Sequence, residues 1–250
     1  MKNKIAQVSN IKMLWHAFET LRARAAGVPG ICLICGMAGF GKSVSVTWLA
    51  VQPMVNAVFV RAQATWTARA MLEKIMLELD AEPLTRNSAM VDYIVRELTR
   101  TERPLIVDEC DYLVEHGGRR LDQMIDTLRD IHDLSSVPLI LVGMKDFQRR
   151  VTRKEQLARR VVQWVEFQPT DLKDARIVAD EICEVQVADD LLASLHKNAA
   201  GSIGRIVVGL AKIENFARQR GKPSVALADW GDRPFSISEA PRPAQTARLR

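Results

Sequence analysis

A glycine-rich segment followed by lysine and serine carries the clearest chemistry in this 250-residue chain. Residues 36–43 read Gly-Met-Ala-Gly-Phe-Gly-Lys-Ser, which fits the G-x-x-x-x-G-K-S pattern of a phosphate-binding loop. Glycines let backbone N–H groups converge on phosphate oxygens, and a helix that begins behind the loop adds the positive end of its dipole. Lys42 would reach the β- and γ-phosphates of ATP, and the Ser43 hydroxyl would help to hold Mg²⁺.

The residues around this loop have the pattern that such a loop requires. Residues 31–35 form an apolar run that suits a buried strand, and an apolar helical pattern follows over residues 44–51. A phosphate-binding loop needs this order of strand, loop and helix. We therefore expect the nucleotide to contact the whole segment, namely Gly36, Met37, Ala38, Gly39, Phe40, Gly41, Lys42, Ser43 and Val44.

Two adjacent acids end another apolar run. Residues 104–107 read Pro-Leu-Ile-Val and lead directly into Asp108 and Glu109. A buried strand that ends in two acids places both at the carboxyl edge of a parallel sheet, where phosphates bind. We predict that Asp108 holds Mg²⁺, directly or through water, and that Glu109 polarises the attacking water. This acid pair predicts ATP hydrolysis and not only nucleotide binding.

The elements that must position these groups form an alternating pattern. Apolar strand patterns cover residues 31–35, 56–60, 104–109, 137–143 and 161–167, and helical patterns separate them. Crossover helices between buried strands indicate a parallel sheet. We therefore predict an α/β fold over residues 1–169, in which helices flank a five-stranded parallel sheet. A helix over residues 8–26 brings Trp15, His16 and Phe18 either to the adenine base or, as we favour, against the sheet.

The pattern changes after residue 169. Only helical patterns follow, over residues 171–185, 189–197 and 203–218, and they predict a small helical lid that spans residues 170–228. Arg205, at the start of the last of these helices, either turns toward the nucleotide or stays on the helix surface. Residues 229–250 mix prolines, serines and arginines, a composition that predicts a disordered basic tail.

Composition and cysteine usage narrow the class of protein. The chain is 48% hydrophobic and 26% charged, as globular proteins are, and its net charge of +5 suits either a polyanionic partner or a solvated surface. It shows neither a signal peptide pattern nor an apolar run of membrane-spanning length, so we expect a cytoplasmic protein without membrane contact. Cys32 and Cys35 face opposite sides of a strand and lack a second cysteine pair nearby. We therefore expect buried free thiols and not a metal site.

Two basic segments allow more than one interpretation. Arg119 and Arg120 follow a pair of glycines and either lie in a solvated turn or contact DNA phosphates. Residues 145–160 contain many more basic than acidic residues, including Arg149 and Arg150. This segment forms a solvated helix face, contacts DNA phosphates, or supplies an arginine finger to the γ-phosphate of a neighbouring subunit.

The sequence resembles an AAA+ ATPase in the motifs it contains and in their order. These motifs are the phosphate-binding loop, the acid pair, the strand at residues 139–143, the Arg159-Arg160 pair and Gly204-Arg205. Over about residues 10–220 the sequence looks most like the B-type transposition ATPases of phage Mu and its relatives, a phage system acting in the bacterial cytoplasm. This resemblance implies an ATP-dependent protein that binds duplex DNA largely without sequence preference, forms homo-oligomeric filaments or rings, delivers target DNA and stimulates a transposase. It also implies that Arg159 or Arg160 is the finger and that Arg205 is the sensor arginine of the lid.

The sequence departs from this family pattern in two places. Met144 stands where a polar sensor residue usually follows the strand, so we expect slow hydrolysis unless DNA or a partner completes the site. Too few residues precede Gly36 for the N-terminal helix-turn-helix of the Mu-type protein, so DNA contact is expected from the ATPase body or the tail. Two other functions stay open: a secretion or signalling ATPase that acts on a protein, and a helicase loader of replication.

Overall fold

The computed structural model describes the backbone of residues 1–113 and 119–235, and within these ranges all side chains except those of residues 119–122. The chain divides into two compact units. The sheet unit comprises residues 7–170, and the helical unit comprises residues 1–6 together with the chain from residue 171 onward.

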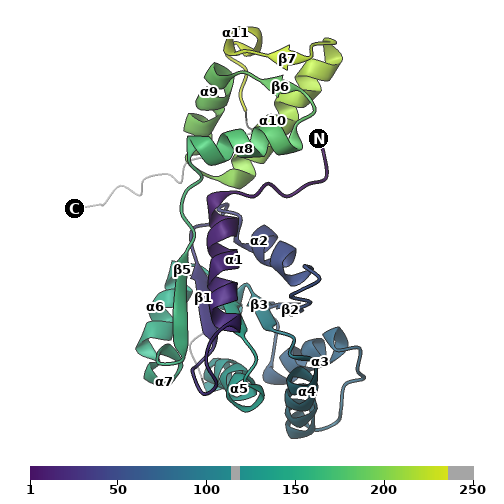
Figure 1. Cartoon of the computed structure of the whole chain (residues 1–250), viewed down its shortest axis with the longest axis vertical. Coiled ribbons are helices and arrows are strands. Elements are labelled where there is room, and N and C mark those ends of the chain that lie inside the picture. Colours follow the sequence, from purple (N-terminus) through teal and green to yellow (C-terminus); the bar gives the residue numbers. More distant parts are fainter. Residues whose placement is uncertain (114–118, 236–250) are drawn as a thin grey trace, which may run out of the picture. The chain divides into compact units, whose positions relative to one another are not determined.

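A five-stranded parallel sheet forms the centre of the sheet unit, as Figure 1 shows. Its strands lie in the order β2-β3-β4-β1-β5, and every neighbouring pair is parallel. This arrangement confirms the predicted fold class. Because β3, β4 and β1 are central and covered on both faces, their residues are all buried. The strand bounds are β1 (Ile31–Cys35), β2 (Val58–Arg61), β3 (Leu105–Asp108), β4 (Leu139–Val142) and β5 (Val161–Glu166).

Helices cover both faces of the sheet and bury two separate apolar clusters. One cluster joins β1 to α1 (Ser9–Arg22) and α2 (Lys42–Ala50). The other cluster joins the opposite face to five helices, namely α3 (Ala68–Glu78), α4 (Asn87–Thr101), α5 (Arg119–Ser135), α6 (Lys145–Arg153) and α7 (Glu155–Ala158). Cys32 belongs to the first cluster and Cys35 to the second, and both are free and buried. The prediction of buried thiols on opposite faces is therefore confirmed.

The aromatic residues of α1 pack within the sheet unit. Phe18 is buried, and the Trp15 ring lies 6.2 Å from it and 5.8 Å from the Trp48 ring, measured between centroids. Such tilted aromatic pairs add to the stabilisation that their burial supplies. Trp15 and Phe18 thus pack against the sheet, the alternative that we favoured, whereas His16 is exposed.

His132 on α5 forms hydrogen bonds to the segments that precede β1 and β4, at the amino edge of the sheet. Its side chain is 4% exposed, and its Nε2 accepts a hydrogen bond from the Gly30 N–H at 3.1 Å. Its Nδ1 lies 2.7 Å from the Val137 carbonyl oxygen, to which it donates. A ring that accepts at one nitrogen and donates at the other is neutral. Burial lowers the pKa of His132 below its ordinary value.

We expect this histidine to make the sheet unit less stable in mild acid. The folded-state pKa lies below the unfolded value of about 6.5, so His132 contributes stability above pH 6.5 that is lost as the pH falls below it. Urea unfolding at pH 8.0 and pH 5.5 should show a larger loss of stability for the wild type than for His132→Gln, which cannot titrate. Equal losses in the two proteins would contradict this role.

The helical unit contains four helices and one small strand pair within its described residues. The helices are α8 (Leu172–Ile182), α9 (Asp189–Ala199), α10 (Ile203–Gln219) and α11 (Leu227–Trp230). Strands β6 (Gln186–Val187) and β7 (Ser224–Val225) pair in parallel, so the expectation of helices only was wrong. Strands of two residues are too short to show an alternating pattern in sequence.

The end of the described chain packs into the helical unit. The Trp230 and Phe235 rings stack with 5.4 Å between their centroids, and both side chains are buried. Residues 229–235 of the predicted tail are therefore part of this unit, and residues 236–250 lie outside the described residues. Across both described ranges, we find no helix with the length and apolar character needed to span a bilayer.

Candidate functional site

The phosphate-binding loop joins the carboxyl end of β1 to the first turn of α2 and depends on its glycines. Gly39 and Gly41 adopt left-handed backbone angles, with φ of 84° and 87°. A side chain at Gly36 would place its Cβ 3.0 Å from the Cβ of Phe167, closer than packed atoms normally approach. Glycine is therefore required here both by backbone conformation and by close packing.

Lys42 bends back over this loop. Its Nζ donates hydrogen bonds to the carbonyl oxygens of Gly36 at 2.8 Å and Met37 at 3.0 Å. Burial lowers the pKa of Lys42, while the negative charges of three carboxylates act in the opposite direction, in the order Asp111, Glu109 and Asp108. The ammonium group is thus held on the loop, where a bound phosphate could replace the two carbonyl oxygens as its partner.

The acid pair lies at the end of β3, at the same edge. Asp108 is only 1% exposed, and its Oδ1 accepts the Glu109 N–H at 2.9 Å. Glu109 has a left-handed backbone with φ of 58°, a conformation that costs a non-glycine residue about 1–3 kcal/mol. Burial raises the pKa of Glu109, and the nearby charges of Asp108 and Asp111 raise it further. The chain therefore holds a partly buried carboxylate in a strained position beside the loop.

The residues available for Mg²⁺ fit that ion. Ser43 lies in the first turn of α2, and Asp108 supplies a buried carboxylate, so both offer the oxygen ligands that Mg²⁺ prefers. Among the described residues, no group of three or more His, Cys, Asp or Glu is arranged to hold a metal. Mg²⁺ keeps several waters and binds through one or two protein groups together with substrate phosphates, and Ser43 and Asp108 are two such groups.

Two charged residues at this site were not predicted from the sequence. Arg61 ends β2 in register with Asp108, and its Nε lies 3.3 Å from the Asp108 Oδ2. Asp111 is 8% exposed, and its Oδ2 accepts the backbone N–H of Met144 at 2.7 Å. The available signals were a charged residue at the end of an apolar strand and a third acid in the run Asp-Glu-Cys-Asp.

The Arg159-Arg160 pair lies at the opposite, amino edge of the sheet. The carbonyl oxygen of Arg160 accepts the N–H of Ile31, the first residue of β1, at 3.3 Å. The six residues of β5 separate this edge from Glu166, which is in register with Cys35 just before the loop. A strand of that length spans about 20 Å. Neither arginine can therefore reach the phosphate-binding loop of its own sheet unit.

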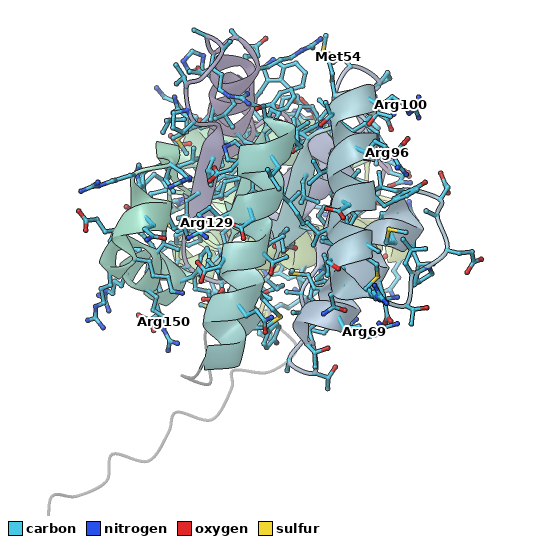
Figure 2. All side chains as sticks on the ribbon, turned by 90° about the horizontal axis from the view of Figure 1, so that it is seen from below. Met54, Arg69, Arg96, Arg100, Arg129 and Arg150 are labelled. Atoms are coloured by element: carbon cyan, nitrogen blue, oxygen red, sulfur yellow. The ribbon has the colours of Figure 1, made fainter. Side chains whose placement is uncertain are left out.

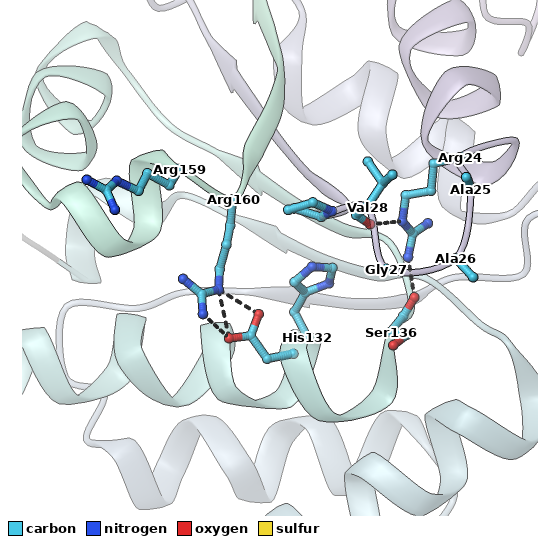
Figure 3. A pocket seen from close by; sticks show the side chains of 11 residues that line it. Arg24, Ala25, Ala26, Gly27, Val28, His132, Ser136, Arg159 and Arg160 are labelled. Carbon is cyan, nitrogen blue, oxygen red and sulfur yellow. Dashed lines mark hydrogen bonds and ion pairs between the residues drawn. The ribbon is translucent and has the colours of Figure 1, made fainter.

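The two arginines differ in how firmly they are held. Arg160 Nε lies 2.7 Å from both carboxylate oxygens of Asp133, and its Nη1 donates to the Gln156 carbonyl oxygen at 2.8 Å. Arg159 is 74% exposed and pairs only with Glu155 one helical turn earlier among the described residues. Both arginines and His132 line a cavity of about 680 Å³. Figure 3 shows that the two arginine side chains point in different directions, with dashed lines marking the ion pair of Arg160.

Arg149 and Arg150 lie on the surface of α6. Phe147 and Val151 anchor α6 in the core, which leaves Arg149 and Arg150 exposed on its outer side. Arg149 pairs with Asp146 at 3.1 Å, and Figure 2 shows Arg150 projecting from the surface of the sheet unit. Arg119 and Arg120 begin α5, but their side chains lie outside the described part of the chain.

Arg205 belongs to the helical unit. It is exposed in the first turn of α10, and its backbone N–H donates to the Ser202 hydroxyl at 3.4 Å. The sheet unit by itself thus brings together the phosphate-binding loop, Asp108 and Glu109. Arg159 and Arg160 lie at the other edge of the sheet, whereas Arg149 and Arg150 follow β4 on α6 and are exposed.

Comparisons with known proteins agree with this geometry. A family model described as an AAA domain matches residues 25–151, about half of the chain. The match supports the AAA+ part of the resemblance drawn from sequence and does not distinguish the phage Mu type from other members. No curated protein matches the sequence.

Several solved structures are similar to the chain. The ORC2 protein of Aeropyrum pernix, in ADPNP-ADP complexes, has a TM-score of 0.67 and 13% identity, over 90% of this chain and 67% of that one. Cdc6p of Pyrobaculum aerophilum has a TM-score of 0.62 and 17% identity, over 88% of this chain and 64% of that one. The ORC1 protein of Aeropyrum pernix in complex with DNA has a TM-score of 0.61 and 16% identity, over 90% of this chain and 63% of that one. This chain thus spans about two thirds of the length of those chains, and the likeness shows a shared fold.

Proposed function

Because the chain belongs to the AAA domain family, we propose that it is an ATPase that binds duplex DNA and assembles on it through ATP sites shared between neighbouring subunits. The observation that carries this proposal is the pair of hydrogen bonds by which Lys42 bends back over the phosphate-binding loop, at the sheet edge where β3 ends in Asp108. A cation on a glycine loop, with acids at the same edge of the sheet, is the arrangement that phosphoryl transfer from a nucleotide requires.

Each residue of the site has a defined task in this proposal. Lys42 binds the β- and γ-phosphates, and the loop N–H groups bind their oxygens. Ser43 and Asp108 hold Mg²⁺, which neutralises charge on the phosphates when it is bound. Glu109 orients a water molecule and accepts its proton, a task suited to a carboxylate whose pKa is raised. The left-handed backbone of Glu109 keeps that carboxylate aimed at the nucleotide.

The finger is proposed to act between subunits, and the structure favours Arg159 for this role. Both arginines are one strand length from their own loop, so either can stabilise only the γ-phosphate of a neighbour. Arg160 is held by Asp133 and Gln156, whereas Arg159 is exposed and forms a surface ion pair with Glu155, an interaction that contributes about 0–1 kcal/mol. Arg159 can leave that pair at little cost.

We expect Arg159→Ala and Arg160→Ala to fail in different ways. Arg159→Ala should reduce DNA-stimulated ATP hydrolysis by at least about 100-fold, with unchanged thermal stability, because only the transition-state charge loses its partner. Arg160→Ala should lower the melting temperature modestly, since it removes the Asp133 ion pair and the hydrogen bond to the Gln156 carbonyl oxygen, and should retain more than about a tenth of the activity. The opposite pattern in steady-state hydrolysis and thermal unfolding would assign the finger to Arg160.

DNA contact is proposed to come from α6. Arg149 and Arg150 are both exposed, and the Arg149–Asp146 pair has 76% exposure of each side chain, so it competes weakly with a phosphate. Binding through phosphates is largely independent of sequence and releases counterions, so it weakens steeply with salt. Arg119 and Arg120 stay proposed as further contacts. The likeness to the ORC1 structure with DNA is compatible with this proposal.

The DNA proposal is tested by the salt dependence of binding. We expect gel shifts of duplex DNA at low salt only with ATP and Mg²⁺ present. The Arg149→Ala/Arg150→Ala double variant should lower the slope of log affinity against log salt by about two, while Arg100→Ala on α4, an exposed and ion-paired arginine, leaves it unchanged. The absence of any ATP-dependent shift would refute the proposed function.

We also propose a protein partner for this ATPase. The order of motifs along the chain supports a protein that delivers target DNA to a transposase and stimulates it. The likeness to ORC2 and Cdc6p favours a second candidate, a replication ATPase that acts on a helicase. Pull-down with each partner in the presence of ATP and DNA separates the two candidates, because only one partner should be retained. The same partner should raise the hydrolysis rate of the bound ATPase.

A further inference from the structure

Met144 is the second residue after β4 and serves as the N-cap residue of α6, but its side chain forms no cap hydrogen bond there. Its thioether is at most a weak acceptor and cannot donate to a phosphate or a water. The polar contact at this point comes instead from the backbone, because the Met144 N–H donates to the Asp111 Oδ2 at 2.7 Å.

Asp111 belongs to the short turn that follows Glu109. This turn is the 3-10 helix η1 (Cys110–Leu113), and the Tyr112 N–H closes it by donating to the Glu109 carbonyl oxygen at 3.1 Å. Asp111 is buried, and of the three carboxylates that act on the Lys42 charge it has the largest effect. Its carboxylate therefore connects the turn that carries Glu109 to the end of β4, and its negative charge favours the charged form of Lys42.

This connection bears on the strained backbone of Glu109. A non-glycine residue keeps a left-handed φ only when its surroundings hold it there. On the amino-terminal side, the Asp108 carboxylate accepts the Glu109 N–H. On the carboxyl-terminal side, the turn is fixed to β4 by the bond from Met144 to Asp111. If that bond were lost, the turn could relax and carry the Glu109 carboxylate away from its position.

We propose that Asp111 is a positioning residue, which takes the place of the missing polar sensor side chain by fixing the turn that carries Glu109 to the end of β4. Hydrolysis depends on this bond, whereas nucleotide binding through the loop and Lys42 does not. The inference rests on the proposed ATPase function and adds a residue to it. It explains how a chain with methionine at this position keeps an ordered catalytic turn.

Two variants separate the hydrogen bond from a general loss of structure. Asp111→Asn keeps an oxygen acceptor of the same size, whereas Asp111→Ala removes it. Three quantities are compared with the wild type: the exchange rate of the Met144 amide hydrogen without nucleotide, the kcat for ATP with DNA, and the Kd for a fluorescent ATP analogue. Asp92→Ala, at an exposed position of α4, is the control.

We expect Asp111→Ala to raise the Met144 exchange rate and to lower kcat, each by at least about tenfold, with Kd changed by less than about threefold. Asp111→Asn should keep the exchange rate and kcat within about threefold of the wild type. Wild-type kcat in Asp111→Ala would overturn the inference, and so would a loss of affinity that matches the loss of kcat.

The remaining outcomes are equally decisive. If Asp111→Ala does not fold, the Asn variant decides, because an Asn variant that protects the Met144 amide but loses activity would show that the bond is not what matters. A wild-type protein that fails to hydrolyse ATP with DNA would refute the proposed function itself. Active wild type with equally active Asp111 variants would refute only the positioning role.

Discussion

Replacing Glu109 by glutamine is expected to reduce ATP hydrolysis by at least about 100-fold while leaving ATP binding intact. A general base contributes about 10²- to 10⁴-fold to such reactions, and an amide cannot accept the proton of the attacking water. The backbone bond from the Glu109 N–H to Asp108 does not involve the side chain, so the site should keep its shape. Assemblies on DNA should therefore form with ATP and persist.

Steady-state phosphate release and the lifetime of the DNA complex measure this effect. Glu102→Gln is a matched control, because Glu102 is an exposed glutamate that also has a left-handed backbone, with φ of 54°, but it lies at the end of α4. It should hydrolyse ATP at the wild-type rate. Equal hydrolysis by Glu109→Gln and the wild type would remove Glu109 from its proposed role.

Lys42→Ala is expected to weaken ATP binding by at least about 100-fold and to abolish ATP-dependent assembly on DNA. The variant loses the charge-assisted hydrogen bonds to the β- and γ-phosphates, which are among the stronger contacts that a protein makes to an anion. In the part of the chain that the structure describes, Lys42 bonds to two loop carbonyl oxygens, and water can replace it there.

Thermal unfolding with and without ATP and Mg²⁺ tests this expectation. The wild type should melt at a higher temperature with nucleotide, because a ligand that binds only the folded state stabilises it. Lys42→Ala should lose that increase and keep the melting temperature of the free protein, and Lys74→Ala, at an exposed position of α3, should behave as the wild type. An undiminished increase in Lys42→Ala would mean that nucleotide binds elsewhere.

The sequence was sufficient for the parts of the site that depend on neighbouring residues. The spacing of Gly36, Gly39 and Gly41 is enough to predict a phosphate-binding loop, because such a loop is formed by residues that are neighbours in sequence. Asp108 and Glu109 could be placed because a fully apolar strand that ends in acids has few alternatives at the carboxyl edge of a sheet. The five-stranded parallel sheet followed from the alternation of such strands with helical patterns.

The parts that the sequence did not reveal depend on contacts between distant segments. Arg61 meets Asp108 only because β2 and β3 pair in one particular register. Asp111 reaches Met144 across 33 positions of the chain. Arg159 and Arg160 look alike in sequence, and only the position of Asp133, 27 residues before Arg160, distinguishes the held side chain from the exposed one.

The central claim is that each ATP site is completed by an arginine of the neighbouring subunit, and a mixing experiment tests it most directly. Glu109→Gln and Arg159→Ala are each expected to be inactive, but a mixed assembly contains interfaces that pair an intact Glu109 with an intact Arg159. With random assembly of equal amounts, about one quarter of the interfaces are of this kind, so DNA-stimulated hydrolysis should recover to about one quarter of the wild-type rate. No recovery at any ratio of the two variants would contradict a shared site.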